Sequence, residues 1–126
     1  MARMLFPNLP VSDVARARTF WTALGFSFDE DFSNEQALAM VVNDTASVML
    51  LEEKFFHSFH DTQPALGTET LTCLGLESRE EVDVLCRAAG EQGAEVTAPT
   101  ENGPMYGGAF RDLDGHLWEL MFMDLA

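Results

Sequence analysis

One carboxylate stands inside a run of β-forming residues near the end of the chain, in the segment Asp112-Leu-Asp-Gly-His-Leu-Trp-Glu119-Leu120. The residues after Gly115 favour a buried strand, so the Glu119 side chain is expected inside the fold. Burial of an unpaired charge is unfavourable enough to shift its pKa and neutralise it. Glu119 is therefore predicted to be paired, protonated or hydrated. It is a candidate acid or base, an anchor for a ligand, or a structural ion-pair partner of Arg111.

The turn before this strand contains Asp114-Gly115, a pair typical of a tight hairpin turn with both residues at positive φ. A calcium loop is the alternative for the sequence Asp-x-Asp-Gly. With Gly115 at the sixth position of such a loop, Phe110 would occupy the first, where calcium needs a carboxylate. The sequence therefore predicts a hairpin.

Two further polar residues are candidates for contacting a ligand. Asn8 has an amide that both donates and accepts hydrogen bonds, which suits a carbonyl or amide group. Tyr106, the only tyrosine, precedes Gly107 and Gly108, where bare backbone allows a ligand to approach closely. Each residue also has a structural interpretation. Asn8 would satisfy backbone groups before Pro10, and Tyr106 would pack its ring and bond its hydroxyl locally.

The segment Phe55-Phe-His-Ser-Phe-His60 places two histidines three residues apart, on one face if it is helical. No third ligand is near in sequence, so His57 and His60 do not make a metal site by themselves. An aromatic flap over a binding cleft, or a contact between subunits, is the better use of the three phenylalanines.

Composition argues against a nucleic-acid-binding function. The chain has 126 residues, the size of one ordinary domain, and a formal net charge of -14. Phosphate contacts need Lys and Arg, of which there are only seven, so nucleic acid is not an expected partner. The acidity either aids solubility or attracts a cationic ligand.

The sequence also indicates a location. The longest unbroken apolar run, residues 37–42, is far shorter than the roughly 20 residues of a membrane helix, so no membrane partner is expected. The first ten residues lack the features of a secretory signal, which makes the cytoplasm the expected compartment. Cys73 and Cys86 form no Cys-x-x-Cys pair and are expected to be reduced.

An internal repeat with an offset of 65 residues relates the two halves of the chain. Ser78 and Glu81 form a capping-box pattern that predicts the start of the second helix. Cys73 falls on Asn8, and a packed cysteine is favoured there because no electropositive neighbour is evident. The repeat is clearest in two apolar helical stripes. They are Ala17, Phe20, Trp21 and Leu24 in the first half, and Val82, Leu85, Cys86 and Ala89 in the second.

Strand-like runs follow each predicted helix, so each half is β-α-β-β-β. The two modules cover about residues 1–62 and 68–126 of a single domain, with a linker near residues 61–68. One helix covers only one face of each sheet, so the other face must be buried otherwise. An α+β fold follows, with two tandem βαβββ modules forming a curved mixed sheet around a shared cleft. The strand-like runs are residues 26–28, 37–42, 48–51, 95–97, 108–111 and 117–122.

In two motifs the chain resembles the vicinal oxygen chelate superfamily of glyoxalases, extradiol dioxygenases, fosfomycin-resistance enzymes and bleomycin-resistance proteins. The motifs are Asn8-Leu-Pro-Val-Ser-Asp13 leading to Phe20-Trp21-x-x-Leu24-Gly25-Phe26, and residues 112–120. Residues 49–51, 55–59, 78–83 and 105–107 are similar to a small glyoxalase-like branch. The resemblance implies the two-module fold and a homodimer. The same scaffold supports isomerases, oxygenases, transferases and binding proteins.

Metal-dependent members of this superfamily take ligands from four strand positions, two in each half. Here the resemblance places Phe6, Leu50 or a neighbour within one residue, Leu71 and Glu119 at these positions. Phe and Leu offer no lone pair to a divalent ion, and one carboxylate does not make a site. We therefore expect no cofactor. Zn, Ni, Mn or Fe would require Asn8, Glu52 or a loop histidine to move in.

Two functions remain open at this point. The first is a binding protein that holds a small molecule in an apolar cleft without the usual metal centre. The second is an enzyme of glyoxalase type, a lyase, isomerase or dioxygenase acting on a small carbonyl compound, with Glu119 moving a proton. The residues expected to contact the ligand are Phe6, Asn8, Leu50, Leu71, Cys73, Tyr106 and Arg111.

Overall fold

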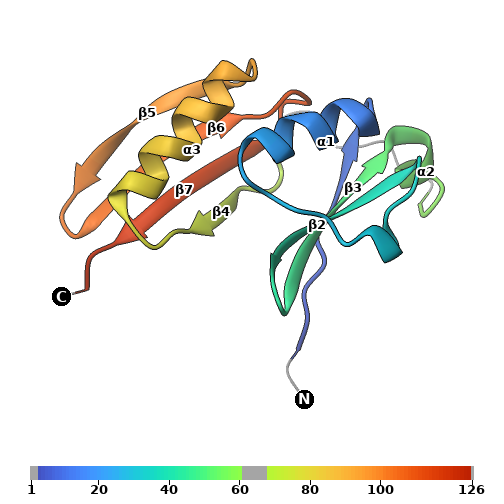
Figure 1. The fold of residues 1–126 in the computed structure, drawn as a ribbon, viewed down its shortest axis with the longest axis horizontal. Coiled ribbons are helices and arrows are strands. Elements are labelled where there is room, and N and C mark those ends of the chain that lie inside the picture. The colour runs from blue at the N-terminus through green and yellow to red at the C-terminus, as the bar shows by residue number, and fades with distance from the viewer. Residues whose placement is uncertain (1–2, 61–67, 126) are drawn as a thin grey trace. The chain divides into compact units, whose positions relative to one another are not determined.

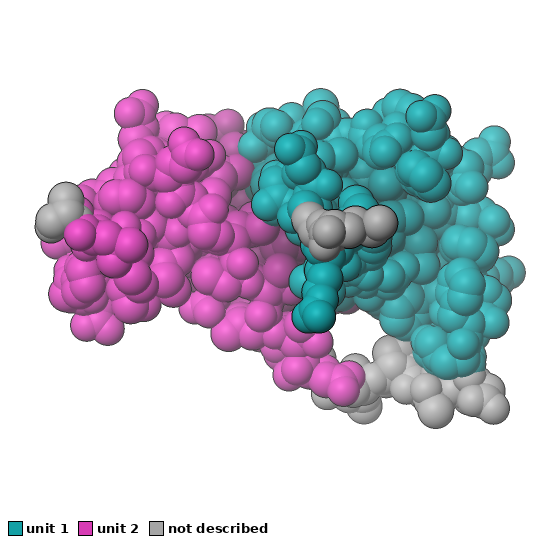
Figure 2. All heavy atoms as spheres, turned by 90° about the horizontal axis from the view of Figure 1, so that it is seen from below, with its two compact units in different colours: residues 1–64 teal, residues 65–126 magenta. Residues whose placement is uncertain are grey.

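The chain divides into two structural units, residues 1–64 and 65–126, coloured separately in Figure 2. A computed structural model describes residues 3–60 and 68–125. The predicted linker near residues 61–68 lies, apart from Thr68, outside the described residues. Each unit has a sheet of its own.

Unit 1 is built on a three-stranded sheet in the order β1-β3-β2, with β1 parallel and β2 antiparallel to β3 (Figure 1). Of the predicted strand at residues 26–28, only an isolated bridge between Phe28 and Met40 forms. Phe26 instead packs edge-on against Trp21, with ring centroids 5.2 Å apart. The elements are β1 (Asn8–Val11), α1 (Val14–Ala23), the 3-10 helix η1 (Glu30–Phe32), β2 (Ala37–Asn43), β3 (Ala46–Glu52) and α2 (Glu53–His57).

The core of unit 1 combines the predicted stripe of α1 with apolar side chains of β2 and β3. Asp13 begins the helix by accepting a hydrogen bond from the Arg16 N–H at 3.0 Å, the usual role of an N-cap carboxylate. Exclusion of this apolar surface from water stabilises the unit. The side chains that are at most 2% exposed include Phe20, Trp21, Leu38, Met40 and Leu50.

Unit 2 has the predicted β-α-β-β-β order, with strands in the order β4-β7-β6-β5. Strand β4 runs parallel to β7, and the other neighbours are antiparallel. The predicted α+β fold class is therefore confirmed. No helix in the described part of the chain is long and apolar enough to cross a membrane. The elements are β4 (Thr72–Gly75), α3 (Arg79–Glu91), β5 (Glu95–Asn102), β6 (Met105–Arg111) and β7 (Leu117–Met123).

Helix α3 starts at the predicted capping residues and covers one face of the unit 2 sheet. Ser78 Oγ accepts a hydrogen bond from the Glu81 N–H at 3.1 Å. The Glu81 carboxylate in turn accepts from the Glu77 N–H, one residue before the cap, at 2.9 Å. The helix lies so close to β6 that a Cβ added at Gly108 would be 2.7 Å from Cys86 Sγ. Gly108 therefore faces α3.

The turn between β6 and β7 differs from the predicted pair of positive-φ residues. Gly115 has φ 84°, whereas Asp114 is not at positive φ. Asp112 N–H donates to the His116 carbonyl at 2.9 Å, and Gly115 N–H donates to the Asp112 carbonyl at 3.0 Å. The loop therefore has three residues and ends in one left-handed glycine. The prediction of two positive-φ residues is wrong, because the Asp112 carboxylate stabilises the longer loop by bonding its backbone.

Candidate functional site

The face of the unit 2 sheet opposite α3 carries Glu119. Strand register places Glu119 beside Cys73 on β4 and Ala109 on β6, and Ala109 beside Thr97 on β5. Residues paired across neighbouring strands point to the same side of a sheet. Because Gly108 faces the helix, Ala109 and its row face away from it. We call this side of the unit 2 sheet, marked by Cys73, Thr97, Ala109 and Glu119, the open face.

The open face is hollowed into a concavity of about 270 Å³. The register of β5 and β6 is irregular between Thr97 and Thr100, and such irregularities bend a strand. Gly107 forms part of the lining, and a Cβ there would lie 2.8 Å from the Leu120 carbonyl oxygen. Close approach of the two strands thus requires bare backbone at this position. Side chains that line the concavity include Thr97, Thr100, Asn102, Met105, Glu119 and Met121.

Glu119 is the only charged residue that lines this concavity in the described part of the chain, and it is half-buried. Within residues 3–60 and 68–125, its carboxylate has no hydrogen bond or ion pair. The carboxylate acts on Cys73, whose thiol pKa is raised by desolvation and, second, by the charge of Glu119. The pair therefore presents one carboxylate beside one neutral thiol.

Arg111 is held at the hairpin end of the unit 2 sheet. Its guanidinium donates to Thr68 Oγ1 at 3.1 Å and to the Gly115 carbonyl at 3.0 Å. No ion pair joins Arg111 to Glu119 among the described residues. The structure therefore does not show the predicted ion pair between Glu119 and Arg111. Arg111 instead forms hydrogen bonds at the turn that precedes β7.

Tyr106 lies on the side of the sheet that α3 covers. Its hydroxyl donates to Asp83 Oδ1 on the helix, and the Arg79 guanidinium lies 5.7 Å from the centre of its ring. The hydrogen bond to Asp83 is the largest cause that raises the Tyr106 pKa. Tyr106 is two residues from Gly108 and shares its side, so it does not line the open face. The local structural role of Tyr106 is the one observed.

Three predicted ligand-contacting residues belong to unit 1. Asn8 is exposed, and its amide donates to the Phe6 carbonyl at 2.7 Å; Phe6 itself is 47% exposed. Leu50 is fully buried in the unit 1 core and pairs with Leu9 and Leu38. The residue opposite Asn8 is Met49. Leu50 therefore points away from the side that carries Asn8, and Met49 shares it.

The residues at the superfamily's metal positions do not fit a divalent ion. Phe6 and Leu71 are exposed apolar side chains, Leu50 is buried, and only Glu119 offers an oxygen. No group of three His, Cys, Asp or Glu residues that could hold a metal ion is present in residues 3–60 and 68–125. A divalent ion needs several nitrogen, oxygen or sulfur ligands at once. On the open face, the only side chains of the four marking residues that could give an anionic ligand to a metal are one carboxylate and one thiol, of Glu119 and Cys73.

The two histidines of the aromatic segment pack against Phe56. His57 lies in the five-residue helix α2, and its ring centroid is 5.6 Å from that of His60. The Phe56 ring contacts both, with centroids at 5.7 Å and 5.0 Å. Phe59 is 67% exposed. The pair of histidines is therefore part of an aromatic cluster.

Asp112, which the sequence does not single out, is the buried carboxylate of the last hairpin. It accepts hydrogen bonds from the backbone N–H groups of Asp114 and His116, both at 3.0 Å, and from Trp118 Nε1 at 2.9 Å. Desolvation by burial raises its pKa, while these bonds oppose the shift. Asp112 shapes the loop that precedes the strand of Glu119, and it could have been recognised as an Asx-turn residue.

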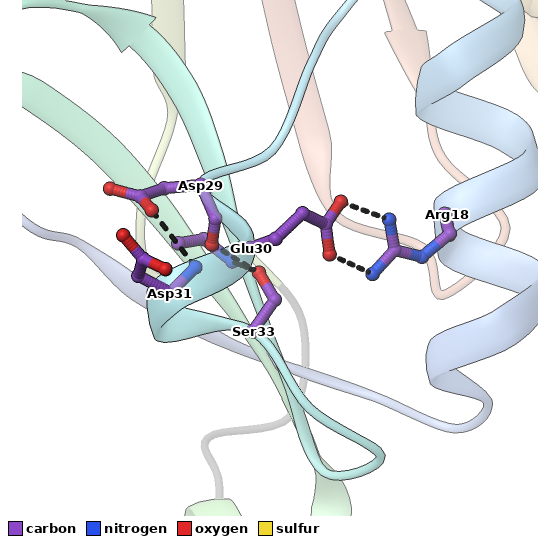
Figure 3. A network of polar contacts seen from close by, with 6 residues as sticks. Arg18, Asp29, Glu30, Asp31 and Ser33 are labelled. Carbon is purple, nitrogen blue, oxygen red and sulfur yellow. Dashed lines mark hydrogen bonds and ion pairs between the residues drawn. The ribbon is translucent and has the colours of Figure 1, made fainter.

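Unit 1 contains a second, more polar concavity of about 790 Å³. One of its lining pairs is an ion pair between Arg18 and Glu30, with two hydrogen bonds of 2.8 and 3.0 Å (Figure 3). This bond lowers the Glu30 pKa. The Asp29 carboxylate accepts from the Asp31 N–H, and the Ser33 hydroxyl donates to the Asp29 carbonyl. The polar groups joined by dashed lines in Figure 3 therefore bond to one another around η1.

Comparison with known proteins gives a consistent result. A family model described as "Glyoxalase/Bleomycin resistance protein/Dioxygenase superfamily" matches residues 3–120. The structure is similar to a hypothetical protein, SA1046, from S. aureus, with 29% identity, a TM-score of 0.83, and coverage of 97% of this chain and 94% of that one. No curated protein matches the chain.

Two more distant structures share the fold. One is a bleomycin resistance determinant encoded on the transposon Tn5, with 22% identity, a TM-score of 0.68, and coverage of 98% and 100%. The other is a lactoylglutathione lyase from Agrobacterium tumefaciens, with 17% identity, a TM-score of 0.71, and coverage of 99% and 96%. Because the family model covers nearly the whole sequence, this chain belongs to the glyoxalase/bleomycin resistance protein/dioxygenase superfamily.

Proposed function

We propose that this protein binds a small molecule in the concavity of the open face, with Glu119 as the polar anchor and without the superfamily's usual metal centre. The observation that carries the proposal is the half-buried Glu119 carboxylate, which lines the concavity without a partner among the described residues. A carboxylate in such a position is stabilised when a ligand supplies hydrogen-bond donors.

The rest of the lining suits a partly apolar guest. Met105 and Met121 supply thioether side chains, which adapt to different shapes because they are unbranched and polarisable. Thr97, Thr100 and Asn102 add neutral polar groups. Ligand sites in proteins combine such apolar walls with a small number of polar groups that fix orientation.

The absence of a metal centre in this proposal follows from the donor set. Glu119 has one carboxylate, and the neighbouring Cys73 holds its proton more tightly than an ordinary thiol. Thiolate, not thiol, is the metal ligand, so the charge of Glu119 works against ligation by its neighbour. One of the structures of similar fold is named as a bleomycin resistance determinant, so its name does not describe an enzyme.

A methyl NMR experiment tests the proposal. Protein labelled with ¹³C at the methionine methyl groups is titrated with small aromatic compounds in the presence of EDTA, and its metal content is measured separately. We expect shifts at Met105 and Met121 and no shift at Met40, which is fully buried in unit 1. Stoichiometric Zn, Ni, Mn or Fe, with binding lost in EDTA, would contradict the metal-free site. Shifts confined to other methionines would contradict the location.

A further inference from the structure

We infer from the geometry of the open face that the bound molecule carries a compact organic cation, an ammonium or amidinium group, attached to an apolar body. This inference rests on the proposed function and names the chemical class of the ligand. It starts from Glu119, the one charged group that lines the concavity in the described chain. A cation with N–H donors would match both its charge and its hydrogen-bonding capacity.

No side chain of the described residues already neutralises Glu119. The guanidinium of Arg111 is held by Thr68 and Gly115 at the hairpin end. Arg79 pairs with Glu101 at 3.0 Å and with Asp124 at 3.8 Å. Arg79 and Arg111 are thus engaged elsewhere, and a ligand with a positive charge would supply the partner that Glu119 lacks among the described residues.

The field of the protein favours the same choice. The chain has 21 acidic and 7 basic residues, giving a formal net charge of -14. Such a field attracts cations and repels anions at a distance, before any contact is made. An anionic ligand would meet this repulsion and then the Glu119 carboxylate in the site. A neutral ligand would leave the carboxylate charge uncompensated in a half-buried position.

The size and lining of the concavity define the body of the ligand. A volume of about 270 Å³ is near the lower end of the range for small-molecule sites, which suits a single ring with a short substituent. The thioethers of Met105 and Met121 offer polarisable contacts to an aromatic ring. Benzylammonium has these properties and is the probe that we choose.

The test compares three compounds of one size and different charge: benzylammonium, benzyl alcohol and benzoate. Each is titrated into protein with ¹³C-labelled methionine methyl groups, and affinity is read from the shifts of Met105 and Met121. Benzylammonium is expected to bind about tenfold more tightly than benzyl alcohol, equal to about 1.4 kcal/mol, and benzoate more weakly still. Added salt should weaken the binding of benzylammonium alone.

Two variants with the same change in net charge complete the test. Glu119→Gln removes the anchor and should weaken benzylammonium binding about tenfold while leaving benzyl alcohol unchanged. Glu95→Gln is the control, since Glu95 is exposed on β5 of the same sheet and does not line the concavity. It should bind as the wild type does.

The outcomes separate this inference from the proposed function. Equal binding of benzylammonium and benzyl alcohol, or an unchanged affinity in Glu119→Gln, would overturn the cationic ligand. The methionine shifts would still support a binding site on the open face. No response at Met105 or Met121 to any of the three compounds would overturn both. If Glu119→Gln fails to fold, the three compounds on the wild type decide the question.

Discussion

Two carboxylates of the last hairpin lie in opposite situations. Asp112 is buried, but three N–H donors satisfy it. Glu119 is half-buried on the open face, with no side-chain partner among the described residues. A satisfied buried carboxylate stabilises local structure, whereas an accessible carboxylate without a partner is available to a ligand. The contrast indicates a structural role for Asp112 and supports the proposed binding role of Glu119.

Replacement of Asp112 by Asn tests the structural role. The variant loses the acceptor for Trp118 Nε1, so the free energy of unfolding should fall by about 1–3 kcal/mol. Urea unfolding of wild type and Asp112→Asn measures the difference. A variant as stable as the wild type would show that the bond to Trp118 contributes little.

The pH dependence of that difference has a defined sign. Burial raises the Asp112 pKa in the folded protein, so the folded state binds a proton more readily than the unfolded chain. The stability that the protonated carboxyl group of Asp112 contributes is therefore fully present below the unfolded pKa. It is lost as pH rises through the folded pKa. The stability advantage of wild type over Asp112→Asn should therefore shrink as pH rises above about 4, the ordinary pKa of an aspartate. An advantage that grows with pH would contradict the shift.

Glu119 should also control the reactivity of Cys73. The charge of Glu119 is the second cause, after desolvation, that raises the Cys73 pKa. Removing this charge in Glu119→Gln should lower the thiol pKa and increase the alkylation rate by iodoacetamide several-fold near neutral pH. Cys86, which is 4% exposed, serves as the internal control because it should stay slow in both proteins. Mass spectrometry of each cysteine peptide follows the reaction, and equal Cys73 rates would show that the two groups do not interact.

At the scale of elements, the contact between α3 and β6 fixes the side of the sheet to which each residue points. Gly108 is close to Cys86 on the helix, and Tyr106 bonds Asp83. Both residues belong to one side of β6, so Gly107 and Ala109 belong to the other. The same contact that builds the core of unit 2 thus assigns Glu119 to the open face through the pairing of Ala109 with Glu119.

A methyl group at Gly108 should disrupt this contact. It would lie 2.7 Å from Cys86 Sγ and 3.1 Å from the Thr97 carbonyl oxygen, which requires the Cys86 side chain or the packing of α3 on β6 to shift. Gly108→Ala should therefore lower the free energy of unfolding by about 1–3 kcal/mol. Gly75→Ala is the matched control, because a Cβ there meets nothing within 4 Å. Chemical unfolding compares the two, and equal stabilities would contradict the close packing.

At the scale of the whole molecule, the excess of acidic residues sets the response to salt. The formal net charge is -14, while the ion pair of Arg18 and Glu30 involves exposed side chains and contributes little. Mutual repulsion among acidic residues opposes folding and is reduced when salt screens it.

Raising NaCl from about 0.01 M to about 0.15 M shortens the screening length from about 30 Å to about 8 Å. The melting temperature should rise over this range, as measured by circular dichroism at constant pH. A fall in melting temperature would show that attractive ion pairs dominate over the net repulsion.

The sequence by itself determined the elements and the fold class. Apolar stripes placed Phe20 and Trp21 on one helix and Val82 and Leu85 on another, because the helical period depends only on neighbouring residues. Strand runs indicated β2, β3, β5, β6 and β7, although residues 26–28 formed only a bridge. Glu119 was recognisable as a carboxylate within a strand, and the structure places it on the open face, while its role in a site stays a prediction.

Only the tertiary structure decided which side of each sheet a residue occupies. Leu50 points into the unit 1 core, Met49 lies opposite Asn8, and Tyr106 faces α3. A shift of one residue in register moves a side chain to the opposite face, and register is set by pairing between distant strands. The partners of Arg111 and the concavity around Glu119 depend on the same long-range contacts, which is why local sequence could name the carboxylate but not its surroundings.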